Sequence, residues 1–166
     1  MFKAGDYVIK PNTGICRIVE IVRLDLLGNG DEKDYYRLDP LGDSRSTLYV
    51  TVDADRKRLR LAMDKQEAMA FIKRIPEIEV AWVANEKLRE QTYKDAFRTN
   101  EAEDLVSIIK NMYLRRQERI AAGKKITATD DKYFQQAEHI LYSELAISLG
   151  VKTDEVRDLI SDTIES

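Results

Sequence analysis

The spacing of apolar residues along the chain changes once, near residue 63. Before that point, short runs rich in β-branched and aromatic residues alternate with turn signals, a pattern typical of β-strands. After it, apolar residues return every three or four positions, which is the spacing of one face of an α-helix. The change predicts a segregated α+β protein, with a sheet domain over residues 1–62 and a helical domain over residues 63–166.

The first part contains five strand-like runs separated by turn residues. The turn signals are residues 11–14, the pair Asn29-Gly30 and residues 41–44, because proline fixes φ and glycine accepts a positive φ. Short strands at this spacing favour a small five-stranded β-barrel, which leaves no exposed sheet edge. The predicted strands are residues 7–10, 15–24, 35–38, 47–52 and 59–61.

The second part predicts a bundle of about five helices. Asp64 followed by Glu67 resembles a capping box that starts a helix. Pro76 is expected to end this helix, because proline cannot continue the helical hydrogen bonds. Residues 77–82 form a connector. The later helices are expected over residues 85–98, from an Asn100 cap to Gly123, from Thr129 to Gly150, and from Thr153 onward. Their inward faces are expected to carry Ala68, Phe71 and Ile72, then Leu105, Ile108, Ile109 and Met112, then Phe134, Ala137, Leu141 and Leu145, and finally Val156, Leu159 and Ile160.

Composition limits the class of protein. Of the 166 residues, 34% are charged and 43% are hydrophobic, which suits a globular chain. No run approaches the roughly 20 apolar residues of a membrane span, and the N-terminus lacks the apolar run of a signal peptide. Cys16 is the only cysteine, so a disulfide within the chain and a cysteine-based zinc site are excluded. We therefore expect a cytoplasmic monomer without a metal or cofactor.

The charges are unevenly distributed around the net value of −3. Residues 127–166 contain three Lys or Arg and nine Asp or Glu, whereas residues 110–125 contain six cations and only Glu118 as an acid. These six cations favour either a strip that faces phosphate groups or a solvated helix end. A second row consists of Lys87, Lys94 and Arg98, which share one helical face.

Residues capable of catalysis are scarce. His139 is the only histidine, and its neighbours at helical spacing offer neither a nucleophile nor a set of metal ligands. Cys16 is expected to be a small buried hydrophobe. The pair Asp130-Asp131 stands at a predicted helix start, where capping explains carboxylates. Without a glycine-rich phosphate loop or a serine elbow, the sequence indicates a protein that is not an enzyme.

The order of these features resembles the CarD family of bacterial transcription regulators. Gly5-Asp6, Pro11 and Gly14 stand at the family's spacing, residues 104–119 are similar to its third helix, and residues 137–146 are similar to its fourth. The resemblance covers nearly the whole chain. It implies a Tudor-like barrel that binds the RNA polymerase β subunit and a helical domain that contacts promoter DNA weakly and without sequence specificity. Such a protein modulates the stability of the open promoter complex.

The resemblance also implies site residues. The polymerase-binding candidates are Arg23, Leu48, Tyr49 and Val50, and the DNA-binding candidates are Trp82, Lys87, Arg89, Lys94, Arg98, Arg116, Lys124 and Lys125. Two positions depart from the family pattern: Tyr49 stands where some relatives have arginine, and Glu86 stands near the expected tryptophan.

Trp82, the only tryptophan, lies about one helical turn before the expected position. It is either a displaced wedge at the DNA or a core residue, and the extended connector favours burial. As a core residue, its replacement by alanine would cost about 3–5 kcal/mol. The displaced tryptophan and the acidic tail also support a second function, a protein-interaction adaptor that never touches DNA.

Overall fold

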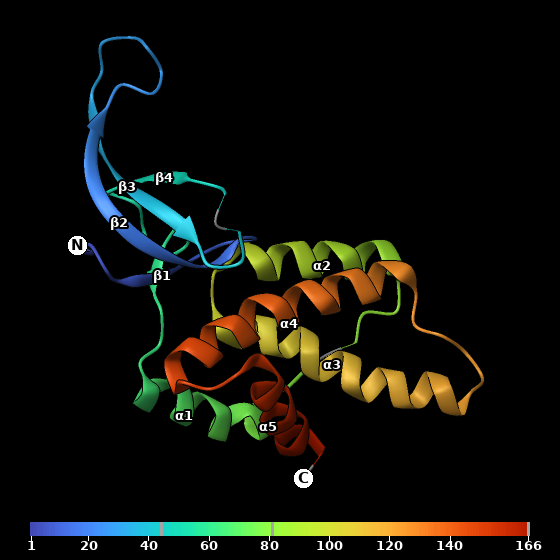
Figure 1. Ribbon diagram of the computed structural model, residues 1–166. Coiled ribbons are helices and arrows are strands. Elements are labelled where there is room, and N and C mark those ends of the chain that lie inside the picture. The colour runs from blue at the N-terminus through green and yellow to red at the C-terminus, as the bar shows by residue number, and fades with distance from the viewer. Residues whose placement is uncertain (44, 81, 166) are drawn as a thin grey trace.

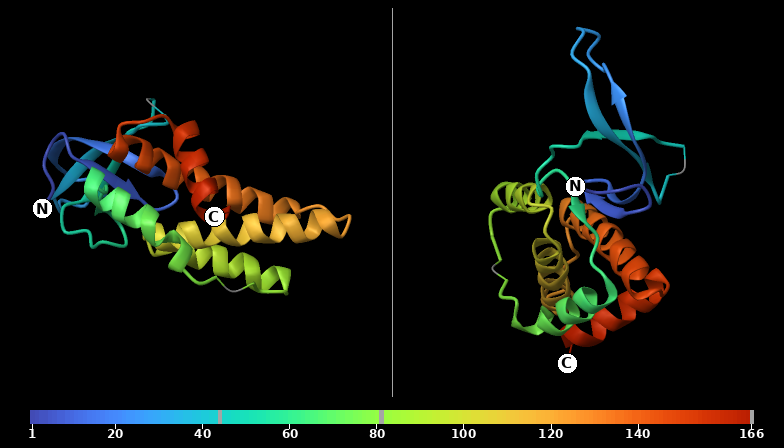
Figure 2. Two further views of the ribbon diagram at one scale, coloured as in Figure 1. Left: turned by 90° about the horizontal axis from the view of Figure 1, so that it is seen from below. Right: turned by 90° about the vertical axis from the view of Figure 1, so that its left-hand side faces the viewer.

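The computed structural model describes residues 1–43, 45–80 and 82–165. It has a five-stranded antiparallel sheet followed by five α-helices, the segregated α+β arrangement that the sequence predicts (Figure 1). The helices extend away from the sheet, which lies at one end of them (Figure 2). Ser44 of the predicted turn and Ala81 of the connector lie outside the described residues.

The sheet follows chain order apart from its last strand. The strands are β1 (Tyr7–Lys10), β2 (Gly14–Leu24), β3 (Lys33–Pro40), β4 (Leu48–Thr51) and β5 (Arg60–Leu61), in the spatial order β4-β3-β2-β1-β5. Its core consists of Val8, Cys16, Ile18, Tyr36, Leu38, Val50 and Leu59. Within the described chain the outer strands β4 and β5 do not pair with each other, so the curled sheet keeps two edges.

Strands β2 and β3 form a long hairpin that projects beyond β4 (Figure 1). The Asp25 carboxylate accepts hydrogen bonds from the backbone N–H groups of Gly28, Asn29 and Gly30 at 2.9, 3.3 and 2.8 Å. Gly28 and Gly30 have φ values of 69° and 84°, a conformation that glycine adopts without strain. The turn signal at Asn29-Gly30 thus lies in an ordered loop closed by one carboxylate.

After the sheet, the described part of the chain contains five α-helices and one short 3₁₀ segment. They are α1 (Lys65–Arg74), η1 (Ile75–Glu77), α2 (Glu86–Arg98), α3 (Ala102–Ala121), α4 (Ala128–Leu149) and α5 (Thr153–Glu165). The capping box of α1 is confirmed, since Asp64 accepts from the Glu67 N–H and the Glu67 side chain accepts from the Asp64 N–H. Helix α4 begins slightly earlier than predicted, with Thr127 as its N-cap.

Two predictions about the helices are wrong. Glu101, and not Asn100, precedes α3 as its N-cap residue. Asn100 adopts a left-handed φ of 58° and donates from its side-chain amide to the carbonyl oxygens of Ile9 and Arg56 at 2.9 and 3.0 Å. Leu159 was expected to point inward but is 43% exposed, because Val156 and Ile160 fill the buried stripe of α5.

The sheet and the helices share part of one core. Ile9 and Ile15 come from β1 and β2, yet they belong to the helical core cluster. Because successive side chains of a strand point to opposite faces, Val8 enters the sheet core while Ile9 faces the helices. The predicted boundary near residue 63 is therefore a boundary between types of secondary structure, across which packing is continuous.

A buried ion pair reinforces this joint. The Arg60 guanidinium donates to both carboxylate oxygens of Glu144 on α4 at 2.7 Å, and the side chains are 3% and 0% exposed. The Met63 N–H also donates to Glu144 at 3.0 Å, and Arg60 Nε donates to the Asn100 carbonyl. Every charge is met by a partner, as a buried pair requires.

Candidate functional site

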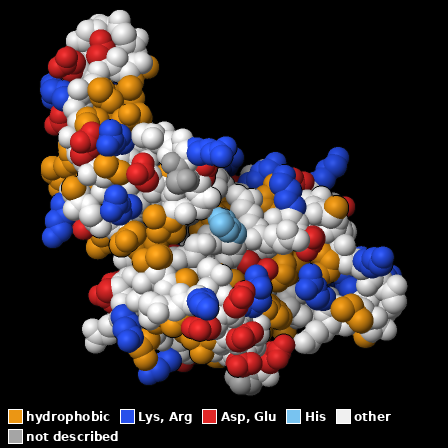
Figure 3. Space-filling view, viewed as in Figure 1, with side chains coloured by type: hydrophobic (Ala, Val, Ile, Leu, Met, Phe, Trp, Pro, Cys, Tyr) orange, Lys and Arg blue, Asp and Glu red, His pale blue; other side chains and the backbone are white. Residues whose placement is uncertain are grey.

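Helix α2 carries a row of exposed cations along one face. Asn85 caps its start by accepting from the Leu88 N–H, and Tyr93 and Phe97 anchor its buried side. This fixes Lys87, Lys94 and Arg98 toward solvent, and Figure 3 shows cationic side chains along this edge of the molecule. Their ion pairs are loose: Lys94 Nζ lies 3.7 Å from Glu90, and Arg98 lies 3.4 Å from Asp95.

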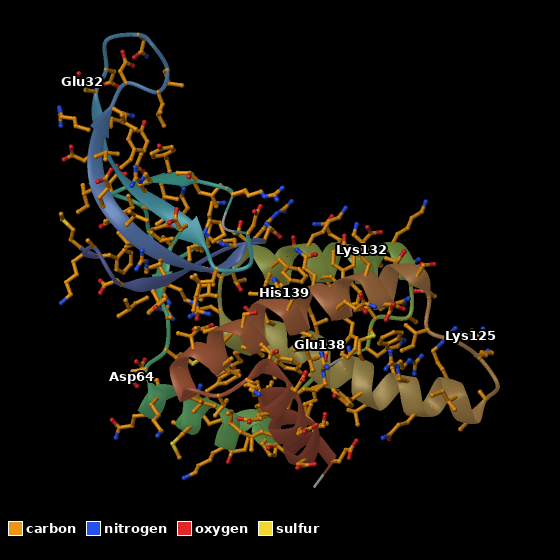
Figure 4. The ribbon with its side chains drawn as sticks, viewed as in Figure 1. Glu32, Asp64, Lys125, Lys132, Glu138 and His139 are labelled. Atoms are coloured by element: carbon orange, nitrogen blue, oxygen red, sulfur yellow. The ribbon has the colours of Figure 1, made fainter. Side chains whose placement is uncertain are left out.

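A second cationic group lies at the far end of the helices. Lys124 and Lys125 are exposed in the turn between α3 and α4, where Figure 4 labels Lys125. Arg116 on α3 is half exposed, lies 3.7 Å from Asp131 and stacks 5.3 Å from the centroid of the Phe134 ring. The exposed cations of the predicted DNA-binding set therefore lie on one face of α2, on α3 and in the turn that follows α3.

Other cations of residues 110–125 have structural roles. Lys110 Nζ donates to the carbonyl oxygens of Ile75, Pro76 and Ile78 at 2.9, 3.1 and 2.7 Å, and so satisfies the end of α1 and η1. Arg119 Nε donates to the Lys125 carbonyl at 2.7 Å. Lys110 and Arg119 are therefore bound to backbone carbonyl oxygens, whereas Arg116, Lys124 and Lys125 are exposed, so the six cations do not form one uniform strip.

Arg89 is a correction to the predicted DNA-binding set. It is 6% exposed, and its guanidinium donates to both carboxylate oxygens of Asp130 at 2.7 and 2.9 Å. It also donates to the carbonyl oxygens of Val83 and Ala84. Since these bonds place its charge inside the helical half, we leave Arg89 out of the DNA-contacting surface.

Asp130 is the centre of this buried network. Tyr93 donates to it at 2.9 Å, and its own N–H donates to the Thr127 hydroxyl at 3.1 Å. Burial acts to raise the pKa of Asp130, but hydrogen bonds from Arg89, Thr127 and Tyr93 outweigh it and hold that pKa below its usual value. The same surroundings raise the pKa of Tyr93, chiefly through burial.

Trp82 lies between its two predicted roles. The side chain is partly buried and packs against the helical core. The guanidinium groups of Arg89 and Arg115 each lie 4.3 Å from the indole centroid, a distance that allows cation–π attraction. The ring is thus held by two arginines, and is neither fully enclosed nor free.

The polymerase-binding candidates lie on or near the outer strand β4. Tyr49 is 40% exposed, Leu48 is partly buried, and Val50 is 3% exposed. Val50 therefore offers a partner only its backbone, whereas Tyr49 offers its ring. Arg23 lies on β2, where its guanidinium pairs with Glu32 and Asp34 of the hairpin at 3.3 and 3.2 Å.

Cys16 and His139, the residues considered for chemistry, lie on different elements, β2 and α4. Burial raises the pKa of the Cys16 thiol to about 11, which suppresses the reactive thiolate. His139 is exposed on α4, as Figure 4 shows. Within the described residues, no group of three or more His, Cys, Asp or Glu side chains could hold a metal ion. No helix in the described part of the chain is long and apolar enough to cross a membrane.

Sequence reasoning missed the residues that join the two halves. Arg60, Asn100 and Glu144 are far apart in the chain, and no local pattern relates them. The one available signal was Glu144 itself, a charged residue beside Leu145 on the apolar face of α4.

Comparison with family models gives two matches in succession. Residues 2–63 match the model described as the CarD-like/TRCF RID domain, and residues 71–161 match the model described as the CarD C-terminal domain. No curated protein matches the chain. The two models together cover both structural halves in the order in which the chain presents them.

Proposed function

Because the chain belongs to the CarD family, we propose that it binds the RNA polymerase β subunit through its sheet and contacts promoter DNA through its helices. The family consists of transcription regulators that interact with RNA polymerase and are not enzymes. In this proposal residues 1–62 form the polymerase-binding domain and residues 63–166 the DNA-contacting one. The protein acts in the cytoplasm as a monomer and modulates the stability of the open promoter complex.

The unpaired edge of β4 supports binding through the sheet. An outer strand presents unpaired backbone N–H and C=O groups, so a strand of the partner can add to it. Leu48, Tyr49 and Val50 provide that edge, and the Tyr49 ring stands beside it. Arg23 lies opposite Asp34 in the sheet register, and the Asp34 carbonyl accepts from the Val52 N–H just after β4.

The exposed cations support weak DNA contact without sequence readout. Lys87, Lys94 and Arg98 on α2, with Arg116, Lys124 and Lys125, are placed to meet phosphate groups, which carry no base identity. Four to six such contacts give a log–log salt slope of roughly −4 to −5 for duplex DNA. Trp82 adds an aromatic contact to this surface only through the part of its ring that Arg89 and Arg115 leave uncovered.

The decisive experiment measures the two activities of the full chain separately. We expect binding to purified RNA polymerase and its β subunit, and weak binding to duplex DNA with the slope given above. Lys94→Glu combined with Arg98→Glu should weaken binding to unrelated DNA sequences equally and leave polymerase binding unchanged. Lys65→Glu with Lys73→Glu, exposed on α1 at the opposite edge of the molecule (Figure 1), is the matched control.

One observation favours the adaptor as a second candidate. Two guanidinium groups lie over the Trp82 ring, each 4.3 Å from its centroid, so the ring is not free to insert between bases. Polymerase binding without measurable DNA affinity at low salt would support the adaptor. A loss of DNA affinity confined to one sequence would indicate base readout and contradict the proposal.

A further inference from the structure

A hollow of about 360 Å³ lies beside the outer strand β4, where the sheet meets the end of α2. Its walls come from the β1–β2 turn, from β4, from the segment between β4 and β5, and from the last turn of α2. The residues that matter are Lys10, Tyr49, Val50, Lys57, Arg58 and Arg98. The hollow therefore brings together side chains that lie far apart in the sequence, from Lys10 to Arg98.

Four of these residues are cations, and no described residue of the lining is acidic. Within the described chain, Lys10, Lys57 and Arg58 have no carboxylate within ion-pair distance, and only Arg98 has one, Asp95 at 3.4 Å. Most other arginines of the protein are paired, including Arg23, Arg37 and Arg56. Three of the four cations thus lack an ion-pair partner, and because like charges placed together repel one another, this arrangement favours an anionic ligand.

We infer that this hollow receives acidic side chains of the RNA polymerase segment that adds to the β4 edge. The inference rests on the proposed function and specifies the chemistry of the partner. Tyr49 and Val50 belong to both the strand edge and the hollow, so a strand paired with β4 lies against it. Carboxylates on that strand would meet Lys10, Lys57 and Arg58.

The surroundings favour a polypeptide over the DNA backbone as the occupant. Pro11 and Tyr49 give the hollow an apolar wall, and β4 supplies main-chain donors and acceptors at its rim. These features match the addition of an extended segment, in which backbone bonds give affinity and side-chain pockets give specificity. A phosphate backbone uses cations but gains nothing from a strand edge.

The test uses the full-length protein and purified RNA polymerase. The variant carries Lys10→Gln, Lys57→Gln and Arg58→Gln, and the matched control carries Lys65→Gln, Lys73→Gln and Lys152→Gln, which remove the same charge from exposed positions elsewhere. We expect the first variant to bind polymerase about tenfold more weakly at low salt, mostly through slower association, and the control to bind as the unchanged protein does. The difference should nearly vanish at about 500 mM salt, because screening removes it.

Charge reversal at two of these cations gives a graded series. Lys57→Glu with Arg58→Glu should weaken polymerase binding more than Lys57→Gln with Arg58→Gln, and the two variants should have the same thermal stability. If the glutamine variant matches the unchanged protein in affinity and salt dependence, the inference is wrong while the proposed function stands. If it loses DNA affinity and keeps polymerase affinity, the occupant is DNA and the inference is also wrong. If the unchanged protein binds no polymerase, the proposed function itself fails.

Discussion

Two buried arginine–carboxylate pairs have the same fork geometry and different surroundings. Arg60 and Glu144 join the sheet to α4 and are sealed from solvent on every side. Arg89 and Asp130 join α2 to α4 within the helical half, and Arg89 also stacks on the partly buried Trp82. One pair therefore fixes how two units meet, and the other positions an aromatic ring near the surface.

The difference shows that burial alone does not determine what an ion pair contributes. A sealed pair cannot change its partners without leaving a charge in the interior. The second pair is continuous with the surface, because the Trp82 ring that it supports also contacts Arg115, whose side chain is 33% exposed. Breaking each pair should therefore give different results, beginning with the largest effect.

The largest effect is expected for Glu144→Gln. This change leaves the Arg60 charge buried beside a neutral amide, so unfolding free energy should fall by about 3–5 kcal/mol. Urea denaturation followed by Trp82 fluorescence and by far-UV circular dichroism measures it. The double change Arg60→Met with Glu144→Leu should regain most of the loss, since it removes both charges. A loss below about 1 kcal/mol for Glu144→Gln would contradict the sealed joint.

A slightly smaller effect is expected for Asp130→Asn. The amide cannot satisfy Arg89 and Tyr93 as the carboxylate does, and the loss should be about 3 kcal/mol. Because Arg89 is released, the emission of Trp82 should shift, while polymerase binding stays unchanged. Asp131→Asn is the matched control: its side chain is 42% exposed, and the expected loss is under about 0.5 kcal/mol. Equal losses in both variants would remove the distinction between the buried and exposed carboxylates.

Trp82→Ala tests how far the second pair reaches toward the surface. A partly buried ring that gains two cation–π contacts should contribute about 1–2 kcal/mol, less than the 3–5 kcal/mol of a fully enclosed tryptophan. Thermal or urea unfolding measures this, with Trp82→Phe as the control that keeps an aromatic face. A loss above about 3 kcal/mol would show that Trp82 contributes as a fully enclosed core residue does.

The smallest effect is the response of Asp130 to acid. Its pKa is held below the ordinary value of 3.8, so the carboxylate binds protons less readily in the folded state than in the unfolded one. The stability that Asp130 contributes is therefore fully present when the pH is above the ordinary pKa of the unfolded chain, and it is lost as the pH falls through the lower pKa of the folded state. The stability gap between the unchanged protein and Asp130→Asn should therefore narrow below about pH 4. A gap that stays constant down to about pH 2 would contradict the lowered pKa.

Local periodicity was enough to predict most of the fold. The stripe of Leu105, Ile108, Ile109 and Met112 is buried as expected, and so is the stripe of α4. Asp64 with Glu67 predicted the first helix start, because a capping box depends only on residues three positions apart. These features are decided by neighbours in the chain.

The candidate site was harder to predict because charge does not reveal burial. Arg89 looked like one more cation of a basic helix, yet Arg89, Tyr93 and Phe97 are spaced four residues apart and share the buried face. Helical spacing therefore held the signal for Arg89. For Arg60 and Glu144, helical spacing marks Glu144 as a charge on an apolar face but does not identify its partner, since the two residues are 84 positions apart and only the packing of sheet on helix brings them together.

Strand β1 affects whether the sheet domain could be exchanged for that of a relative. It is four residues long, and its two faces line two different interiors: Val8 lines one and Ile9 the other. A chimaera that takes its first 62 residues from a relative would also replace part of the wall around the recipient's helices. A junction at residue 63 therefore lies between secondary-structure types but divides the helical core cluster, to which Ile9 and Ile15 contribute. Recombination there should succeed only between parents whose residues at position 9 and on α4 have diverged together.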